Sequence, residues 1–397
     1  MKQNKLFAIA LLFLCVIAVS ACTRNAQLTG GSNWPGLTSE DDIVYSANGS
    51  FVEAVRDGKK LWSYPAEANR NLSFYAVPAV DDKYVYVGTY SNQLHILNKA
   101  DGTLAASVEI GNNKNKIIAS PLVAEGKVYA VSSGGMVSSY NVNVSGETMT
   151  PNWQSTLTSE AWVKPVLYNG TLYVASMEKK LHLLDDATGQ AKDSLAIGAV
   201  MSDIVLKDGK LYFTTLSKEV NEMDLATNEI RTLLTTEGEI WASPLLMGDK
   251  LIAADMKGYV YCIDIASGST VWKTEKLTPE KSGFIASPIA LDEETILLLD
   301  ESGYIMTYDM DGKSIGQRAL GQSSATTPVV LSNGSFAVTP ITAEDGLINA
   351  YTPELKEDWI FTRSAASAAD AAAEPTVEAT VDTAAEPTAE PTAAEAK

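Results

Sequence analysis

Residues 259–272 have the sequence YVYCIDIASGSTVW, and the same pattern returns along most of the chain. An alternating apolar run ends at Asp264, a Ser267-Gly268 turn follows, and a second run leads to Trp272. A period of two is typical of a strand, and a Ser-Gly pair is typical of a turn. The pattern therefore predicts a recurring β-hairpin. Further copies of the first run lie at 94–98, 181–185 and 305–309.

The spacing of the copies predicts a propeller. A short run of aromatic or branched residues precedes each hairpin, and a period of about 40–45 residues made only of strands is the signature of a propeller blade. Each unit has room for four strands of ordinary length. We therefore expect an all-β fold of four-stranded blades. The tyrosines that mark the period are Tyr45, Tyr86, Tyr129, Tyr173 and Tyr212, in steps of 41, 43, 44 and 39.

A series of prolines in the same phase gives the number of blades. Proline cannot donate to a strand ladder, so it fits the start of the innermost strand, beside the central channel. One interval, from Pro165 to Pro244, is twice as wide, and Asp203 is predicted to stand there in place of proline. Seven prolines and one degenerate copy predict an eight-bladed propeller over residues 34–363. The seven are Pro35, Pro78, Pro121, Pro165, Pro244, Pro288 and Pro328.

Two other architectures fit the repeat less well. A pair of separate β-sandwiches gives no reason for prolines locked to an eightfold period. A β-solenoid is built from far shorter repeats. The repeat count therefore favours the propeller.

The N-terminus predicts export and a lipid anchor. Lys2 and Lys5 precede an apolar run over 6–19, which is the length of a secretory signal and too short to span a membrane stably. The run ends in small residues set against Cys22, an arrangement that resembles the lipobox of bacterial lipoproteins. The resemblance implies a signal peptide over 1–21, acylation of the Cys22 thiol, and a flexible linker over 22–33. The alternative is an ordinary signal peptide that happens to end near a cysteine.

The C-terminus is not predicted to belong to the fold. Residues 364–397 are almost entirely Ala, Glu, Pro, Thr, Asp and Val, with Glu-Pro-Thr repeated, and carry seven acids against one base. No aromatic residue is present to be buried, so we expect a disordered acidic tail. A helix over its alanine-rich first half is the alternative, and the later prolines argue against it further on.

Charge and cysteine content exclude several functions. The chain has 30 Lys and Arg against 49 Asp and Glu, a net charge of −19, which excludes nucleic-acid binding. Of the three cysteines, Cys15 leaves with the signal and Cys22 carries lipid, so Cys262 is the one remaining thiol and no intramolecular disulfide can form. Two histidines leave little material for a zinc site.

The repeat unit is similar to that of the pyrroloquinoline-quinone-like propellers, over nearly all of 34–363. With the lipobox, the chain resembles the lipoprotein propellers of the outer-membrane β-barrel assembly machinery. That resemblance implies a non-enzymatic, membrane-anchored scaffold, a monomeric propeller that binds protein partners through its loops. The same repeat also serves sensor ectodomains, so a cell-surface or sensory binding module is the alternative. The acidic tail slightly favours this alternative.

A quinone-dependent dehydrogenase is the enzymatic alternative. For that class the resemblance implies a calcium ion, a catalytic aspartate and a disulfide between adjacent cysteines. Cys262 has no neighbouring cysteine, and the units are too short for the long loops that build an active-site face. We therefore predict no enzyme, no catalytic residue, no cofactor and no metal.

The residues that attract a catalytic interpretation have structural explanations. His95 and His182 occupy the same register of two blades, predicted to be neighbouring sheets, and are expected to be strand-face residues. The aspartates that end third strands are expected to bond their own turns. No apolar loop patch is apparent, since loops 111–116 and 235–238 are polar. The turn aspartates are Asp185, Asp224, Asp264 and Asp309, and the fourth-strand tryptophans expected between blades are Trp62, Trp153, Trp272 and Trp359.

Overall fold

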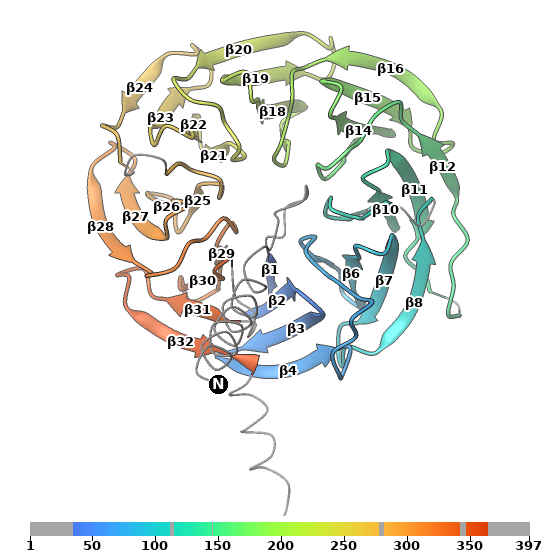
Figure 1. Cartoon of the computed structure of the whole chain (residues 1–397). Helices are drawn as coiled ribbons and strands as arrows, with labels where there is room; N and C mark the ends of the chain where they lie inside the picture. Colours follow the sequence, from blue (N-terminus) through green and yellow to red (C-terminus); the bar gives the residue numbers. More distant parts are fainter. Residues whose placement is uncertain (1–34, 112–114, 145, 278–281, 342–346, 364–397) are drawn as a thin grey trace, which may run out of the picture.

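The computed structural model describes residues 35–111, 115–144, 146–277, 282–341 and 347–363. It is an all-β propeller of eight four-stranded antiparallel sheets around a central axis (Figure 1), as predicted. The predicted signal peptide at 1–21, the predicted linker at 22–33 with Cys22, and the predicted tail at 364–397 lie outside the described residues. Within the described ranges, no helix has the length and apolar character needed to cross a membrane.

Each blade is formed by four consecutive strands that pair in chain order. Blades one to four contain β1 (Gly36–Glu40), β2 (Ile43–Asn48), β3 (Phe51–Arg56), β4 (Lys59–Tyr64); β5 (Ala79–Val80), β6 (Tyr84–Gly88), β7 (Gln93–Asn98), β8 (Leu104–Glu109); β9 (Leu122–Ala124), β10 (Lys127–Val131), β11 (Met136–Asn141), β12 (Trp153–Thr156); β13 (Val166–Tyr168), β14 (Thr171–Ser176), β15 (Lys180–Asp185) and β16 (Ala191–Ala196). Blades five to eight contain β17 (Val205–Lys207), β18 (Lys210–Thr214), β19 (Glu219–Asp224), β20 (Ile230–Thr235); β21 (Leu245–Met247), β22 (Lys250–Ala254), β23 (Val260–Asp264), β24 (Thr270–Lys273); β25 (Ile289–Ala290), β26 (Thr295–Leu299), β27 (Tyr304–Asp309), β28 (Ser314–Ala319); β29 (Val329–Val330), β30 (Phe336–Val338), β31 (Ile348–Tyr351) and β32 (Glu357–Phe361).

The seven prolines each stand directly before the innermost strand of a blade, as predicted. The prediction that Asp203 takes the place of proline in the degenerate copy is wrong by one residue. The inner strand of blade five begins at Val205, so Ile204 stands where the other blades have proline. Asp203 instead aligns with Lys164 and Ser243, the residues before Pro165 and Pro244. The Asp208-Gly209 turn after β17 aligns with the Asn169-Gly170 turn after β13, and this alignment puts Ile204 opposite Pro165.

The core lies between the blades, because both faces of each sheet are covered by a neighbour. One cluster joins Tyr129 and Trp153 of blade three to Leu172 and Leu184 of blade four. The predicted role of the fourth-strand tryptophans is confirmed. The indole N–H of Trp153 donates to the carbonyl of Asp186 in the next blade, over 2.6 Å. Trp62 and Trp272 donate likewise to Lys99 and Met310, and Trp359 packs against the core shared by the last and first blades.

Ring closure depends on side chains, because no strand is exchanged between the first and last blades. The hydroxyl of Thr326 donates to the carbonyl of Pro35 over 2.9 Å. At the outer edge, Arg363 donates from Nε and Nη2 to the two carboxylate oxygens of Glu53, each over 2.9 Å. Glu53 is fully buried. We call Glu53 and Arg363 the closing ion pair.

Candidate functional site

The two histidines occupy the same register, the third residue of β7 and of β15, and both are buried. Their blades are not neighbours, however, because the sheet β9–β12 lies between them. The expectation of neighbouring sheets was therefore wrong, while the strand-face placement is confirmed. The separation also means that His95 and His182 cannot act as a pair.

His95 is held in its neutral form by its partners. The amide oxygen of Gln93 lies 3.1 Å from Nε2 and can only accept, so Nε2 carries the proton. The Tyr64 hydroxyl, from the preceding blade, lies 3.0 Å from Nδ1 and donates to it. Both ring nitrogens are thus satisfied without a charge, and burial lowers the pKa of His95 to about 4.

We expect acid to weaken the fold through His95. Its folded pKa lies below the ordinary value of 6.5, so the unfolded chain binds the proton first and stability falls as the pH drops from about 6.5 towards 4. Between pH 7 and pH 4.5 this group contributes a loss of roughly 2–3 kcal/mol. Urea unfolding at both pH values should show a smaller loss for His95→Gln than for the wild type. Equal losses would contradict this assignment.

His182 has neighbours that superficially suggest a hydrolase triad. The hydroxyl of Ser176 lies 3.0 Å from Nε2, and a carboxylate oxygen of Glu178 lies 3.2 Å from the same nitrogen. A triad histidine needs the nucleophile on one ring nitrogen and the orienting carboxylate on the other. The shared nitrogen therefore cannot fill both roles. Burial also lowers the pKa of His182.

The remaining predicted positions behave as structural residues. A carboxylate oxygen of Asp185 accepts from the backbone N–H groups of Ala187 and Thr188, over 3.1 and 3.0 Å. Asp224, Asp264 and Asp309 bond their own turns in the same way, so the prediction for these aspartates is confirmed. Cys262 is buried, and burial raises the pKa of its thiol to about 11, which keeps it protonated.

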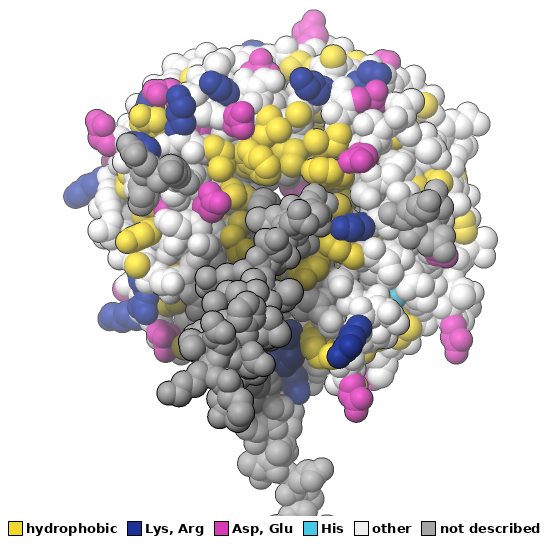
Figure 2. All heavy atoms as spheres, in the orientation of Figure 1, with side chains coloured by type: hydrophobic (Ala, Val, Ile, Leu, Met, Phe, Trp, Pro, Cys, Tyr) yellow, Lys and Arg dark blue, Asp and Glu magenta, His cyan; other side chains and the backbone are white. Residues whose placement is uncertain are grey.

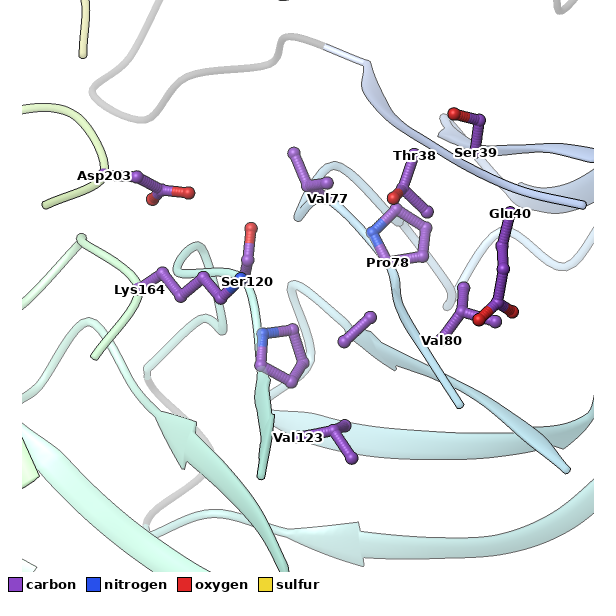
Figure 3. Close-up of a pocket in the computed structure, with 12 residues that line it drawn as sticks. Thr38, Ser39, Glu40, Val77, Pro78, Val80, Ser120, Val123, Lys164 and Asp203 are labelled. Atoms are coloured by element: carbon purple, nitrogen blue, oxygen red, sulfur yellow. The ribbon is translucent and has the colours of Figure 1, made fainter. Parts of the chain in front are cut away.

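A cavity of about 260 Å³ opens on the central channel (Figure 3). Its wall comes from the inner strands of blades one to three and from Lys164 and Asp203 in the next two blades. Figure 3 shows these two side chains reaching in from one side, with Val77 and Thr38 opposite and the Ser120 hydroxyl between them. The lining is polar and contains both signs of charge. In the part of the chain that the structure describes, no three His, Cys, Asp or Glu side chains could together hold a metal ion.

Lys164 and Asp203 belong to a ring of residues that ties the blades together around the channel. In blades six to eight, the N–H of Ser243 donates to the Ser287 hydroxyl over 2.9 Å, and the N–H of Ser287 donates to the Thr327 hydroxyl over 3.0 Å. Lys164 and Asp203 occupy the equivalent positions in blades four and five. The surrounding blades raise the pKa of Asp203, although its side chain reaches the channel, and the charge and backbone of Lys164 oppose the rise.

The loops on one face form a hydrogen-bonded rim around the channel. In each case the N–H of a residue in the turn between the second and third strands donates to the connection that enters the same blade. Met177 donates to the carbonyl of Glu160 over 2.8 Å, and Leu216 donates to that of Ala199 over 2.9 Å. The bond repeats from Tyr90 to Ser73, from Ser133 to Lys116, from Met256 to Glu239 and from Glu301 to Gly283. Loops tied in this way make a rigid surface rather than a mobile one.

This rim carries large apolar side chains that are only half-buried. One set stands three residues before the start-of-strand position, and another stands in the turns. Figure 2 shows apolar side chains gathered beside the channel over blade five. We call these residues the apolar collar. Its members are Tyr75, Ile118, Trp162, Met201, Trp241 and Ile285 in the connections, and Tyr90, Met177, Leu216 and Met256 in the turns.

The expectation that no apolar loop patch exists was therefore wrong. Two polar loops suggested it. Residues 112–114 of the first lie outside the described part of the chain, and Glu237 of the second pairs with Lys273. The sequence does contain a signal for the collar. The residue three positions before the proline, or before Ile204 in blade five, is apolar in every connection from Tyr75 to Ala325. Tyr90 also packs against Tyr75, with ring centroids 4.9 Å apart and the ring planes tilted by 53°. Contiguous exposed apolar surface commonly marks a protein-interaction site.

Sequence comparison finds known proteins that are similar to this chain. A family model described as outer membrane protein assembly factor BamB matches residues 47–274, more than half of the chain. The BamB of Xanthomonas campestris pv. campestris is 31% identical over 114 residues, which span 28% of this chain and only 27% of that protein. The BamB of Moranella endobia is 26% identical over 323 residues, 77% of this chain and 68% of that protein.

A solved structure is similar over a longer range. The crystal structure of BamB from Moraxella catarrhalis has a TM-score of 0.66 and 18% sequence identity, and the match covers 83% of this chain and 97% of that one. At this identity the similarity supports the fold, and any role in binding must be argued from the residues of this chain.

Proposed function

This chain belongs to the family of outer membrane protein assembly factor BamB, and we propose that it acts as a lipid-anchored, non-enzymatic scaffold in outer-membrane protein assembly. The anchor is Cys22, at the extracytoplasmic face of a membrane. The partner is a protein, and its docking surface is the apolar collar. A propeller suits this role because its closed ring presents loops on a rigid frame.

The observation that carries the proposal is the collar itself. Its turns and connections are locked to one another by repeated backbone hydrogen bonds, so a partner meets a pre-organised surface. Tryptophan and tyrosine are the residues most enriched at the centres of protein interfaces, and Trp162, Trp241, Tyr75 and Tyr90 are all members. The charge of −19 further disfavours a nucleic-acid partner.

Crosslinking in cells tests the docking surface. A photo-crosslinker at Trp241 or Met256 should capture a component of the assembly machinery. Leu216→Glu should reduce that yield at least about tenfold, because it buries a charge at the centre of the interface. Leu104→Glu is the matched control, since Leu104 is 45% exposed on the outer strand β8. Capture of a surface component instead, unaffected by Leu216→Glu, would favour a cell-surface binding module.

Lipidation has a separate test at Cys22. Metabolic labelling with a fatty acid should mark the wild-type protein and should fail completely in Cys22→Ala, which should also leave the membrane fraction. One acyl-modified residue places the propeller at the membrane without a spanning helix. Cys15→Ala is the matched control and should keep the label, because that residue is removed with the signal. Labelled Cys22→Ala protein would contradict the assignment.

A further inference from the structure

The described chain enters the propeller on the face that carries the apolar collar. The carbonyl of Pro35 accepts from the hydroxyl of Thr326, which lies in the connection that enters the last blade. A Cβ placed on Gly36 would lie 2.6 Å from the carbonyl oxygen of Ala76, the residue after the collar member Tyr75. The entry point therefore lies among the connections that form the collar, beside the channel.

The C-terminal end of the fold lies at the same face, at the outer rim. Arg363 follows β32, the outermost strand of the last blade, and bonds Glu53 of β3 in the first blade (Figure 1). Its guanidinium also lies over the ring of Phe51, the first residue of β3. That strand begins at a turn between a second and a third strand, and turns of this kind belong to the collar face. Both ends of the fold are therefore on one face.

The segment before Pro35 limits how far the entry point can lie from a membrane anchor. Thirteen residue steps separate Cys22, the proposed site of acylation, from Pro35. A fully extended chain spans no more than about 3.5 Å per residue, so this segment reaches at most about 45 Å. The entry point must lie within that distance of the membrane surface.

This reach favours one orientation of the propeller. If the collar faced away from the membrane, the segment would have to run outwards past four strands and then along the side of a blade. Neighbouring strands lie about 4.8 Å apart and a six-residue strand is about 20 Å long, so this path takes about 35 Å along the strand axes alone. Loops and side chains lengthen the path further. No such detour is needed when the collar faces the membrane.

The charges of the two faces favour the same orientation. On the face opposite the collar, the described turns that join first to second and third to fourth strands contain 17 Asp and Glu against 4 Lys, a net charge of −13. The described turns and connections of the collar face contain 10 Asp and Glu against 7 Lys and Arg, a net charge of −3. Anionic phospholipid headgroups therefore repel the opposite face far more strongly than the collar face.

We propose that the short N-terminal tether holds the collar face towards the membrane, so that the partner of the collar is a protein held at that same membrane. The acidic face is turned away, into the surrounding compartment. The inference rests on the proposed function for the acyl group at Cys22 and for the collar as the docking surface.

Energy transfer to lipid tests the orientation. The lipidated protein is reconstituted in vesicles of phosphatidylethanolamine and phosphatidylglycerol that contain an acceptor dye on a minor lipid headgroup. An azide-bearing amino acid at Ser217 or at Ala226 carries the donor dye. Both are exposed turn residues of blade five, Ser217 on the collar face and Ala226 on the opposite face, with β19 between them. Transfer from Ser217 should be at least about twofold more efficient, because the six residues of β19 span about 20 Å. Equal transfer, or stronger transfer from Ala226, overturns the inference.

Two further samples separate the tether from the proposed function. Protein without its signal, coupled through the Cys22 thiol to a maleimide lipid, should show the same difference even where cells do not acylate this residue, and the buried Cys262 does not compete. Failure of acylation in cells with unequal transfer in this sample removes the proposed anchor and supports the geometry. Insertion of about 40 Gly and Ser residues after Asn33 should bring the two efficiencies together. A difference that the insertion leaves unchanged overturns the tether as its cause.

The location of the partner is tested in cells. In the Cys22→Ala variant, the protein captured by a photo-crosslinker at Trp241 should still sediment with the membrane fraction, because the partner itself is held there. A captured partner that is soluble in these cells overturns its assignment to the membrane.

Discussion

Replacing Arg363 with alanine lowers the free energy of unfolding by about 3–5 kcal/mol, because it leaves the Glu53 carboxylate buried without its partner. Glu53 is fully buried, and both of its oxygens accept from Arg363. The guanidinium also lies 4.2 Å from the ring centre of Phe51. Because the first and last blades exchange no strand, this pair is one of the few charged contacts that close the ring. Urea unfolding of the wild type and Arg363→Ala measures the difference.

A double variant separates the cost of burying a lone charge from the net contribution of the ion pair to the free energy of unfolding. Glu53→Leu with Arg363→Leu removes both charges, and it should recover more than half of the stability lost in Arg363→Ala, since an apolar pair avoids the desolvation cost. Arg56→Ala is the matched control, because Arg56 is exposed and donates only to a backbone carbonyl. A double variant as unstable as Arg363→Ala would show that the pair contributes through packing with Phe51 instead.

The blades could be predicted from sequence because their signals are local and repeated. A proline before the inner strand, an Asn-Gly or Asp-Gly turn and an alternating third strand each lie within a few residues of one another. The closing ion pair could not be predicted in this way. Glu53 occupies the same third-strand register as His95 and His182, but its partner lies 310 residues away.

The candidate site was harder to predict for a different reason. The apolar collar becomes a surface only when the ring brings the third residues before successive prolines together, and each of them alone is one apolar residue in a loop. The backbone hydrogen bonds that lock these loops join residues far apart in the sequence, such as Tyr90 with Ser73 and Met256 with Glu239, so they also appear only in the folded blades.

The second large effect is expected at the junction between blades three and four, where the indole of Trp153 covers Gly189. Gly189 has φ +71° and lies under Trp153, with a new Cβ only 2.4 Å from the ring. Gly189→Ala should therefore displace an indole that is 8% exposed and weaken its bond to Asp186, in addition to the strain of a left-handed alanine. We expect a loss of about 3–4 kcal/mol in the free energy of unfolding.

Gly170 in the same blade isolates the steric part of that loss. Its φ is +67°, nearly that of Gly189, but nothing lies within 4 Å of a Cβ placed there. Gly170→Ala should then cost only the backbone strain, about 1 kcal/mol. Urea unfolding of the two variants should differ by roughly 2–3 kcal/mol. Equal losses would show that the indole yields to a methyl group at little cost, and that contact with the glycine does not set how closely the blades approach.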